Sequence, residues 1–518
     1  MRNFGQAVAE FSVRSTADNV FNILPTGQLK SKLAHAARSR RVSPIRAAHN
    51  QHDCTERDDE SRKTGLAERP GYRRPLKGTM MAQNSINTDN NQPKLVVAER
   101  ELTGIDTSPE TMLSIPGSRM FEINEALKIY LDREPNGTVF DASQGDGGAS
   151  LPGVSRELLE EAHRLQLEHG TGYDKPFGTP AFRRAVVEDY WGLDSSTGWG
   201  PTNVIACQGG RDALVKAYDA VQFLGHQRRG DFVLVSRVPW ISYNWGPYAM
   251  GANVMLAPGS EDEAWALTPE AIRKSSDEAA SFDGRRLALL VITSPDNPTG
   301  RSMSAENQIA LARSAFAAGV PFVLFDWIYH RVTDGEPMNL NAFLGALEPE
   351  ERERCIFLDG ITKSLGASNV RNAHLVAPER VVKFIQSRAS HAVIPSFHSQ
   401  AVAMAAYRMG FERAAAPIVG PTNASRRVVE EFLEGHEIRH ILGKGYYAFF
   451  DLSPWLERAG MTDTAEFGAV LAQQYGLAVV PGSYFSEFGK RWIRYSYATP
   501  PDVTAGALAR MWEALSAQ

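Results

Sequence analysis

The stretch PFVLFDWIYH, residues 321–330, decides how this chain is interpreted. Its apolar part, Val323 to Phe325, has the composition of a strand that is buried on both faces. The run ends directly in Asp326, and Tyr329 follows three residues later. Taken alone, this pattern predicts a strand end with two solvated polar residues. A functional interpretation requires that other strands also end in polar residues.

Three similar apolar runs occur in the same part of the chain: FVLVSRV at 232–238, LALLVIT at 287–293 and CIFLDGI at 355–361. Segments with helical periodicity separate them, such as AENQIALARSAFAAG at 305–319. Continuous apolar strands that alternate with amphipathic helices are typical of a parallel sheet covered on both faces. We therefore predict an α/β fold whose large domain holds a mostly parallel sheet with helices on both faces.

The apolar pattern changes after about residue 380. Apolar and polar residues alternate more in GYYAFFDLS at 445–453, LAVVPGSYF at 477–485 and WIRYSYA at 492–498. This pattern predicts a smaller C-terminal α/β domain. The predicted divisions are a basic leader at 1–95, an N-terminal arm and helix that contribute to the small domain at 96–170, the large domain at 171–380 and the small domain at 381–518.

The bulk composition excludes several classes of protein. The 518 residues are 43% hydrophobic and 22% charged, which allows two or three domains with substantial cores. A net charge of −5 gives no reason to expect a nucleic-acid partner. No apolar run approaches the roughly 20 residues that span a bilayer, so we expect no membrane partner. Three scattered cysteines, Cys54, Cys207 and Cys355, form no disulfide framework or C-x-x-C motif, which favours a reducing compartment.

Positive charge is concentrated in the first 80 residues, which hold 15 Lys and Arg against 8 Asp and Glu, a net of +7. The remaining residues therefore carry a net charge of −12. The segment lacks the periodic apolar pattern of a core. It is interpreted either as an organellar transit peptide or as a disordered leader that precedes Met80 and Met81. We expect a cytoplasmic protein, with organellar import left open.

One short motif suggests a different chemistry. HEIRH at 436–440 matches the H-E-x-x-H pattern of zinc peptidases, in which one helix face presents two ligands and a general base. Gly435 and Gly443 flank the motif, so we do not expect a continuous helix through both histidines. The motif is interpreted as a polar helix end and loop, and no metal site is predicted.

Polar clusters follow three of the apolar runs named above and a fourth run, TNVIA at 202–206. The clusters are SPDNPTG at 294–300, Asp326 with Tyr329, DGITKSLGASNVR at 359–371 and CQGGRDAL at 207–214. The carboxyl ends of parallel strands meet at one edge of a sheet, where ligands bind in open α/β folds. The sequence therefore predicts a functional site built from these clusters.

An ordered set of residues, Asn297 in NPTG, Asp326 with Tyr329, Lys363 and Arg371, resembles the core of the fold type I, class I/II aminotransferases, which use pyridoxal 5'-phosphate (PLP). Asp326 follows Asn297 by 29 residues and Lys363 follows Asp326 by 37, as is usual in that family. The similarity covers roughly residues 110–518. It implies a PLP-dependent aminotransferase that moves an amino group between an L-amino acid and a 2-oxo acid.

The resemblance implies three catalytic residues. Lys363 would hold the cofactor as a Schiff base and act as a base at the substrate, because a buried lysine can become a neutral amine. Asp326 would keep the cofactor's ring nitrogen protonated, since a carboxylate favours a neighbouring cation. Tyr329 and Asn297 would hydrogen-bond the ring's phenolic oxygen.

Further residues would bind the cofactor's phosphate. The resemblance places Gly209, Gly210 and Arg211 at a helix start, where free N–H groups and the helix dipole favour an anion. Arg371 would add a charge-assisted hydrogen bond. Tyr173, in YDKPFGTPAFRRAV, matches a tyrosine that contacts the phosphate across a subunit interface, which implies a homodimer with shared active sites.

The chain departs from its relatives at three places, one of which is the region around Trp240, where the usual proline–x–aromatic order is missing. Many relatives carry a serine three residues before the lysine, where this chain has Gly360. Thr362 or Ser364 would then take over the phosphate contact. Gly147, in the stretch GDGG, stands where relatives commonly have proline. These changes suggest a divergent branch of the family.

The substrate and the ring would meet four more residues. Arg494, in WIRYSYA, would bind the substrate's α-carboxylate, although Arg491 is close enough in sequence to be confused with it. Gly145 and Asn297 would also lie near the substrate. Trp240 would stack on the ring, with Tyr243 as the alternative. If these two residues bind no ligand, Trp240 is interpreted as a core residue and Arg494 as an exposed strand residue.

The same fold supports other reactions. A PLP-dependent lyase or decarboxylase acting on an amino acid is therefore the alternative function. A remote alternative is a regulatory sensor with an aminotransferase-like domain. Such a protein needs a DNA-binding module, and residues 1–80 show no pair of apolar-periodic helices joined by a tight turn.

Overall fold

A computed structural model describes residues 119–225, 230–282, 284–332, 335–388 and 391–517. The leader predicted for residues 1–95 lies outside these described residues. The first part of the predicted arm, up to residue 118, also lies outside them.

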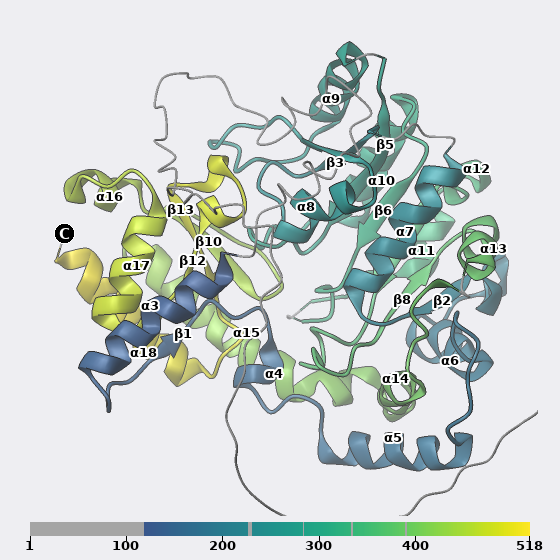
Figure 1. Cartoon of the computed structure of the whole chain (residues 1–518), viewed down its shortest axis with the longest axis horizontal. Helices are drawn as coiled ribbons and strands as arrows, with labels where there is room; N and C mark the ends of the chain where they lie inside the picture. The colour runs from purple at the N-terminus through teal and green to yellow at the C-terminus, as the bar shows by residue number, and fades with distance from the viewer. Residues whose placement is uncertain (1–118, 226–229, 283, 333–334, 389–390, 518) are drawn as a thin grey trace, which may run out of the picture. The chain divides into compact units, whose positions relative to one another are not determined.

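A seven-stranded sheet forms the larger part of the fold, with the strand order β2-β8-β7-β6-β5-β3-β4 (Figure 1). Its strands are β2 (Val204–Cys207), β3 (Phe232–Val235), β4 (Asn253–Leu256), β5 (Leu287–Thr293), β6 (Val323–Asp326), β7 (Cys355–Asp359) and β8 (Ala373–Val376). Neighbouring strands are parallel except at β8, which is antiparallel to both β2 and β7. The predicted mostly parallel sheet is confirmed.

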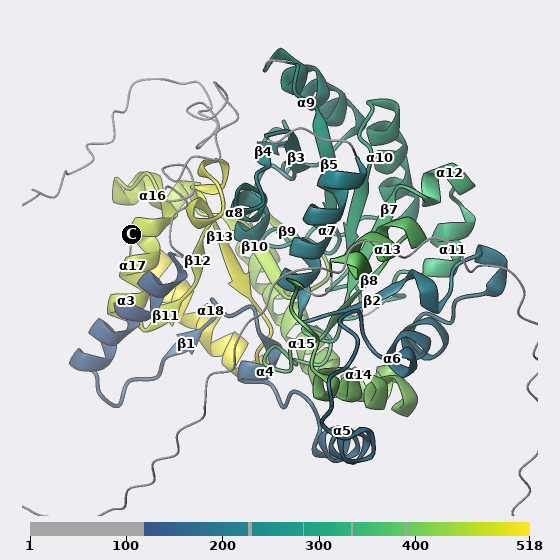
Figure 2. The ribbon, with the colours of Figure 1, turned by 45° about the vertical axis from the view of Figure 1, so that its right-hand side comes forward.

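Both faces of this sheet are buried, as its continuous apolar strands predict. In β6, Val323 and Phe325 point into one core and Leu324 into the other. The helices of the first core include α5 (Arg156–His169), α6 (Pro180–Ala185), α9 (Pro269–Ser281), α10 (Ala305–Ala317), α11 (Leu340–Gly345) and α14 (Phe397–Met409). The second core is covered by α7 (Gly210–Leu224), α8 (Ile241–Ala249) and α13 (Glu379–Ser387). Helices α5 and α14 lie side by side (Figures 1 and 2).

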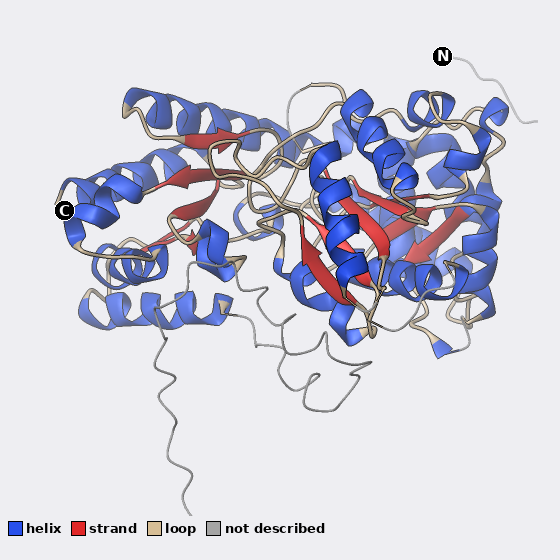
Figure 3. Ribbon diagram, turned by 90° about the horizontal axis from the view of Figure 1, so that it is seen from above, coloured by secondary structure: helices blue, strands red, loops and turns tan. Residues whose placement is uncertain are grey.

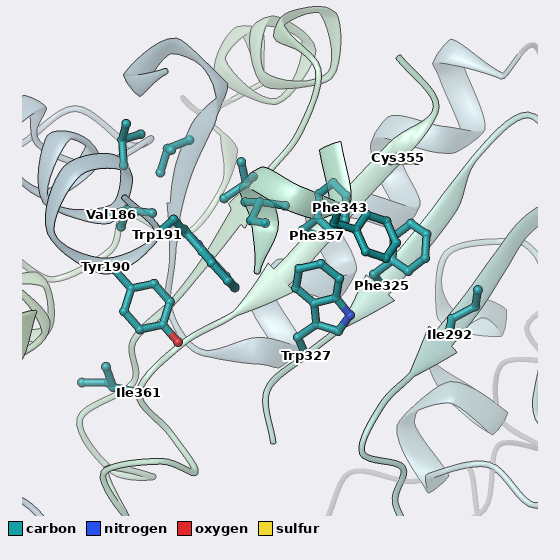
Figure 4. Close-up of a cluster of buried hydrophobic side chains, with 14 of the residues drawn as sticks. Val186, Tyr190, Trp191, Ile292, Phe325, Trp327, Phe343, Cys355, Phe357 and Ile361 are labelled. Carbon is teal, nitrogen blue, oxygen red and sulfur yellow. The ribbon is translucent and has the colours of Figure 1, made fainter. Parts of the chain in front are cut away.

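Aromatic packing holds the end of β6 in place (Figure 4). The Phe325 ring stacks on Phe357 of β7 with centroids 5.1 Å apart, and Trp327 packs against both rings. The indole N–H of Trp327 donates to Gln308 Oε1 at 2.8 Å, so this buried polar group is satisfied. The residues on either side of Asp326 are therefore fixed by the core.

Two smaller sheets lie apart from the large one (Figure 3), and most of their strands come from the C-terminal part of the chain. Strands β9 (His440–Leu442), β10 (Tyr447–Asp451), β12 (Val480–Pro481) and β13 (Trp492–Ser496) form an antiparallel sheet in the order β12-β13-β10-β9. A second pair is parallel and joins β1 (Phe140–Asp141) to β11 (Leu477–Ala478). The N-terminal helix α3 (Met120–Arg133) packs on α17 (Thr464–Tyr475). The smaller α/β part is confirmed, and the proposed domain limits at residues 170 and 380 stay a prediction.

The remaining helices are α4 (Gly147–Ser150), α12 (Pro349–Arg352), α15 (Phe411–Gly435), α16 (Ser453–Ala459) and α18 (Pro501–Ser516). Within the described ranges, no helix combines the length and the apolar character that a membrane crossing needs.

The histidines of HEIRH do not share a helix face. Helix α15 ends at Gly435, and Glu437 adopts a left-handed conformation with φ of 53°. The His436 ring stacks on Trp512 with centroids 3.6 Å apart, whereas His440 belongs to β9. The predicted helix end and loop is confirmed. Among the described residues, no group of three or more His, Cys, Asp or Glu side chains could hold a metal ion.

A buried polar network ties the end of β7 to the loop after β6. Asp359 accepts a hydrogen bond from the Tyr190 hydroxyl at 2.5 Å and lies 2.8 Å from His330 Nε2. His330 Nδ1 accepts from the Met338 N–H at 3.0 Å, so the Nε2 proton is the one that faces Asp359. Burial acts to raise the pKa of Asp359, but His330, His374 and the Tyr190 hydroxyl together outweigh it and the pKa is lowered. Asp359 is therefore the ionised centre of the network.

We expect Asp359→Ala to lower the free energy of unfolding by about 3–5 kcal/mol, because it leaves buried partners without their acceptor. Urea unfolding followed by circular dichroism measures this change. The exposed pair Glu157–Arg413 provides the control, since Glu157→Ala should change the free energy of unfolding little. Equal effects of the two substitutions would contradict a structural role for the network.

Candidate functional site

A cavity of about 520 Å³ lies at the carboxyl ends of β5, β6 and β7. Most of the predicted site residues line it: Gly145, Gly210, Arg211, Trp240, Asn297, Asp326, Tyr329, Thr362, Lys363, Arg371 and Arg494. Two of them do not. Gly209 lies behind the wall, and the Tyr173 side chain is 98% exposed to solvent.

The strand register brings the central residues together. Thr293 of β5 pairs with Asp326 of β6, and Asp326 pairs with Leu358 of β7. All three residues line the cavity. The loops that carry Asn297 and Lys363 start a few residues beyond this line, so they leave the sheet at the same edge.

Asp326 is a buried carboxylate at the bottom of the cavity. One oxygen accepts a hydrogen bond from the Tyr243 hydroxyl, and the other accepts from the Ile328 N–H at 3.0 Å. Burial raises the pKa of Asp326 to about 6, and these hydrogen bonds oppose the rise. A cation placed opposite Asp326 would stabilise the ionised form of this carboxylate.

Lys363 extends into the cavity from the loop after β7. Its ammonium donates a hydrogen bond to the carbonyl oxygen of Gly145, and Nζ lies 5.6 Å from the centroid of the Tyr329 ring. The absence of a side chain at Gly145 leaves space for the Tyr447 hydroxyl beside the Lys363 amine. A Cβ atom at that position would lie 2.5 Å from the Tyr447 hydroxyl oxygen.

Tyr329 is buried, and its hydroxyl oxygen lies 3.0 Å from that of Tyr447. Burial raises the pKa of Tyr329 well above its ordinary value, and Tyr447 adds to the rise. Tyr329 is therefore a neutral phenol that can donate a hydrogen bond to an anionic oxygen in the cavity.

One end of the cavity is built for an anion. Helix α7 begins at Gly210, so its first N–H groups are free of helical partners. Arg371, with φ of 61°, places its guanidinium beside them and donates to the Ser368 carbonyl oxygen at 2.6 Å. A Cβ atom on Gly209 would lie 2.3 Å from Arg371 Nη2. Gly209 thus makes room for Arg371 instead of lining the cavity.

The departure at Gly360 has a structural explanation. A Cβ atom on Gly360 would lie 2.7 Å from Ala373 Cα, so the serine common among relatives does not fit here. Thr362 lines the cavity and donates to the Asn372 carbonyl oxygen at 3.3 Å. Ser364 does not line it, whereas Ser368 does, and the buried Ser368 hydroxyl has no hydrogen-bond partner in the part of the chain that the structure describes.

Arg494 is 3% exposed and carries a buried guanidinium. Its Nη1 donates to Asn297 Oδ1 at 3.0 Å and its Nη2 to the Ser143 carbonyl oxygen at 2.6 Å, while Nε has no partner among the described residues. These acceptors are neutral. A buried cation with neutral partners favours an anionic ligand. The interpretation of Arg494 as an exposed residue is wrong, and Arg491 instead pairs with Glu457.

The aromatic wall differs in part from the expectation. Trp240 caps α8 and lines the cavity, half-buried, with the Arg211 guanidinium 5.7 Å from its ring centroid. Tyr243, the alternative stacking residue, packs edge-on against Trp240 and hydrogen-bonds Asp326. Trp240 therefore forms part of the cavity wall, and Tyr243 donates a hydrogen bond to Asp326.

Several wall residues are not found by the sequence analysis: Arg119, Met120, Thr293, Ser368, Tyr447, Tyr484 and Phe485. Ser368 lies between Lys363 and Arg371 in the sequence, so the phosphate role given to Thr362 or Ser364 could have been extended to it. The others give no local signal. Tyr447 in particular reaches the cavity from β10 of the smaller sheet.

The wall residues fit pyridoxal phosphate at its three chemically distinct points. The α7 N-terminus, Arg371 and the unpartnered Ser368 hydroxyl suit a phosphate. The buried Asp326 suits a protonated ring nitrogen. The Lys363 amine suits an aldehyde.

Comparisons with known proteins agree with this geometry. The family model described as "Aminotransferase class I and II" matches residues 136–511, well over half of the chain. The aspartate aminotransferase of Geobacillus stearothermophilus is 27% identical over 383 residues, which cover 72% of this chain and 91% of the relative. The aspartate/prephenate aminotransferase of Thermus thermophilus is 28% identical over 361 residues, which cover 68% and 86%.

A solved structure shares the fold. A double mutant of the Thermus thermophilus aspartate aminotransferase superposes with a TM-score of 0.65 at 23% sequence identity. The match covers 79% of this chain and 100% of that chain.

We expect Asp326→Asn to stabilise the ligand-free protein above pH 6. The pKa of Asp326 rises from 3.8 to about 6 on folding, which corresponds to at most about 3 kcal/mol of destabilisation once the group is ionised. This cost is absent below pH 3.8, grows between pH 4 and 6, and is complete above pH 6. Thermal unfolding of both proteins across pH 4–8 measures it. An Asn variant that is less stable at pH 8 than at pH 4, relative to wild type, would contradict the expectation.

Proposed function

Because the chain belongs to the class I and II aminotransferase family, we propose that it is a pyridoxal phosphate-dependent aminotransferase acting on an L-amino acid and a 2-oxo acid. The observation that carries this proposal is the presence of Lys363, Asp326 and Arg494 on one cavity wall. They supply a nucleophilic amine, a buried carboxylate for a ring cation and a guanidinium for a substrate carboxylate.

Each part of the cavity has a role in holding the cofactor. The N–H groups at the start of α7, with Arg211, Thr362, Ser368 and Arg371 around them, would bind the phosphate, and Gly209 would make room for Arg371. Trp240 would cover one face of the ring.

The remaining contacts would set the chemistry of the ring. Asp326, held by Tyr243, would bind the ring nitrogen in its protonated form. Tyr329 and Asn297 would donate hydrogen bonds to the ring oxygen. When bound, pyridoxal phosphate supplies an aldehyde for the lysine amine and a ring that accepts the electron pair released at the substrate's α-carbon. Lys363 would move the proton at that carbon.

The substrate side is supported by Arg494. Its buried guanidinium would bind the α-carboxylate, next to Asn297 and Gly145. The relatives reported above are named for aspartate and for aspartate with prephenate. We therefore propose aspartate as the first amino donor to test.

We also propose a homodimer with shared active sites. Tyr173 supports this proposal, because a tyrosine that is 98% exposed is available to contact a second subunit. A cytoplasmic location is likewise proposed, on the basis of three scattered cysteines that form no disulfide framework.

The first test of the proposed function is covalent trapping. The wild-type protein mixed with pyridoxal phosphate and reduced with borohydride should carry a stable adduct on Lys363, identified by peptide mass spectrometry. Lys363→Ala should lose the adduct and reduce amino transfer from aspartate to 2-oxoglutarate at least about 100-fold, because it removes the nucleophile and the base. Lys383→Ala, at an exposed lysine paired with Glu379, is the control and should behave as wild type.

Analysis of the reaction products distinguishes amino transfer from the alternative reaction of a lyase. Release of ammonia and a 2-oxo acid from an amino acid, without any amino acceptor, would indicate a lyase. An adduct on another lysine, or none in the wild type, would contradict the assignment of Lys363.

Shared sites predict complementation between two impaired variants. Tyr173→Ala weakens the phosphate contact given to the partner, and Lys363→Ala removes the amine from its own site. Mixed dimers would contain one intact site, so mixing the two proteins after partial unfolding should restore up to about a quarter of wild-type activity. Activity that never exceeds the sum of the two separate variants would contradict sharing.

A further inference from the structure

Tyr447 lines the cavity, although it belongs to the smaller sheet. It is the first residue of β10 and is 1% exposed. Its ring lies under the Arg494 guanidinium, with Cζ 4.4 Å from the ring centroid. Its hydroxyl oxygen lies 3.0 Å from that of Tyr329. Tyr447 therefore contacts Arg494, which is proposed to bind the substrate's α-carboxylate. It also contacts Tyr329, which is proposed to donate a hydrogen bond to the cofactor's ring oxygen.

The hydroxyl and the ring of Tyr447 serve different neighbours. The ring gives Arg494 a flat electron-rich surface, which a phenylalanine would also provide. The hydroxyl lies between Tyr329 and Gly145, whose carbonyl oxygen accepts from Lys363. Among the described residues, Tyr329 is the hydrogen-bond partner of this hydroxyl, so we expect an effect of the hydroxyl to pass through Tyr329.

We propose that the Tyr447 hydroxyl is a positioning group of the site, which donates a hydrogen bond to Tyr329 and thereby strengthens the hydrogen bond that Tyr329 offers to the cofactor's ring oxygen. This inference rests on the proposed function. Two hydroxyls 3.0 Å apart share one proton along the line between them. If Tyr329 directs its own proton to the cofactor, Tyr447 must be the donor of the shared bond.

The physical effect follows from cooperativity. A hydroxyl whose oxygen accepts a hydrogen bond is polarised and becomes a better donor. A stronger hydrogen bond from Tyr329 would stabilise the anionic form of the cofactor's ring oxygen, and it would thereby lower the pKa at which the bound cofactor loses its proton. The charged and titratable groups that face the two phenols are Lys363, Arg494, Tyr446 and, beside Tyr447, Tyr497.

The alternative is a purely structural role, in which the two buried phenols only satisfy each other's hydrogen-bonding groups. In that case the Tyr447 hydroxyl would affect folding stability and leave the cofactor unaffected. Tyr497, which follows β13, provides the comparison. It is fully buried, and its hydroxyl has no hydrogen-bond partner among the described residues.

The test is the pH dependence of the visible absorption band of the protein loaded with pyridoxal phosphate. In Tyr447→Phe, we expect the apparent pKa of the band to rise by about half to one pH unit, as the loss of one hydrogen bond allows. Tyr497→Phe, which makes the same chemical change nearby, should leave this pKa unchanged. A pKa in Tyr447→Phe equal to that of wild type overturns the inference.

A double variant tests the route of the effect. Tyr329→Phe should raise the same pKa by more, and Tyr329→Phe with Tyr447→Phe should raise it no further, because the hydroxyl acts only through Tyr329. Additive rises would overturn the inference. A wild-type protein without any visible band would instead refute the proposed function, so the two failures can be distinguished.

A second measurement separates the hydroxyl from the ring. Succinate binding to the loaded protein, followed by the change in its visible spectrum, reports on the Arg494 clamp. Because phenylalanine keeps the ring, Tyr447→Phe should change the succinate dissociation constant by less than about twofold. A larger loss of affinity would mean that the hydroxyl acts by placing Arg494, which would also overturn the inference.

Discussion

Parallel hydrogen bonding between β5, β6 and β7 holds Thr293, Asp326 and Leu358 in one line at the edge of the sheet. Each of these strands ends where its loop must leave the sheet, so the residues that follow are delivered to the same place. Asn297 and Lys363 depend on this register. A slip of one residue would turn every side chain of a strand to the opposite face, because side chains alternate along it. Since both faces are apolar cores, such a slip would also bury Asp326 away from the cavity.

The cavity holds charges under conditions that cost stability. Burial opposes the ionisation of Asp326 by raising its pKa. Arg494 is a buried cation whose hydrogen-bond partners are neutral. In a site built only for stability, both groups would be paired or replaced by apolar residues. Their persistence makes sense if a ligand supplies the opposite charges, a ring cation for Asp326 and a carboxylate for Arg494. The site is thus incomplete as a set of interactions until it binds its ligand.

Rigid surroundings keep these charges in place. Stacking of Phe325 on Phe357 fixes the strands beneath Asp326, while Asp359 and His330 join the loops that carry Lys363 and Tyr329. None of the four side chains that form this support, Phe325, Phe357, Asp359 and His330, lines the cavity. Positioning by a packed core is more exact than positioning by flexible loops, because each side chain is locked by its neighbours.

The sequence by itself determined the large sheet, its covering helices and the residues at the strand ends, because these depend on local composition and on spacing along the chain. Asp326, Tyr329, Lys363 and Arg371 could be singled out for the same reason. Only the tertiary structure decided that Tyr243 donates to Asp326, that Gly209 makes room for Arg371, and that Tyr447 lies against Tyr329, 118 residues away in sequence. Such contacts join different elements, so they depend on how those elements pack, which no local pattern encodes.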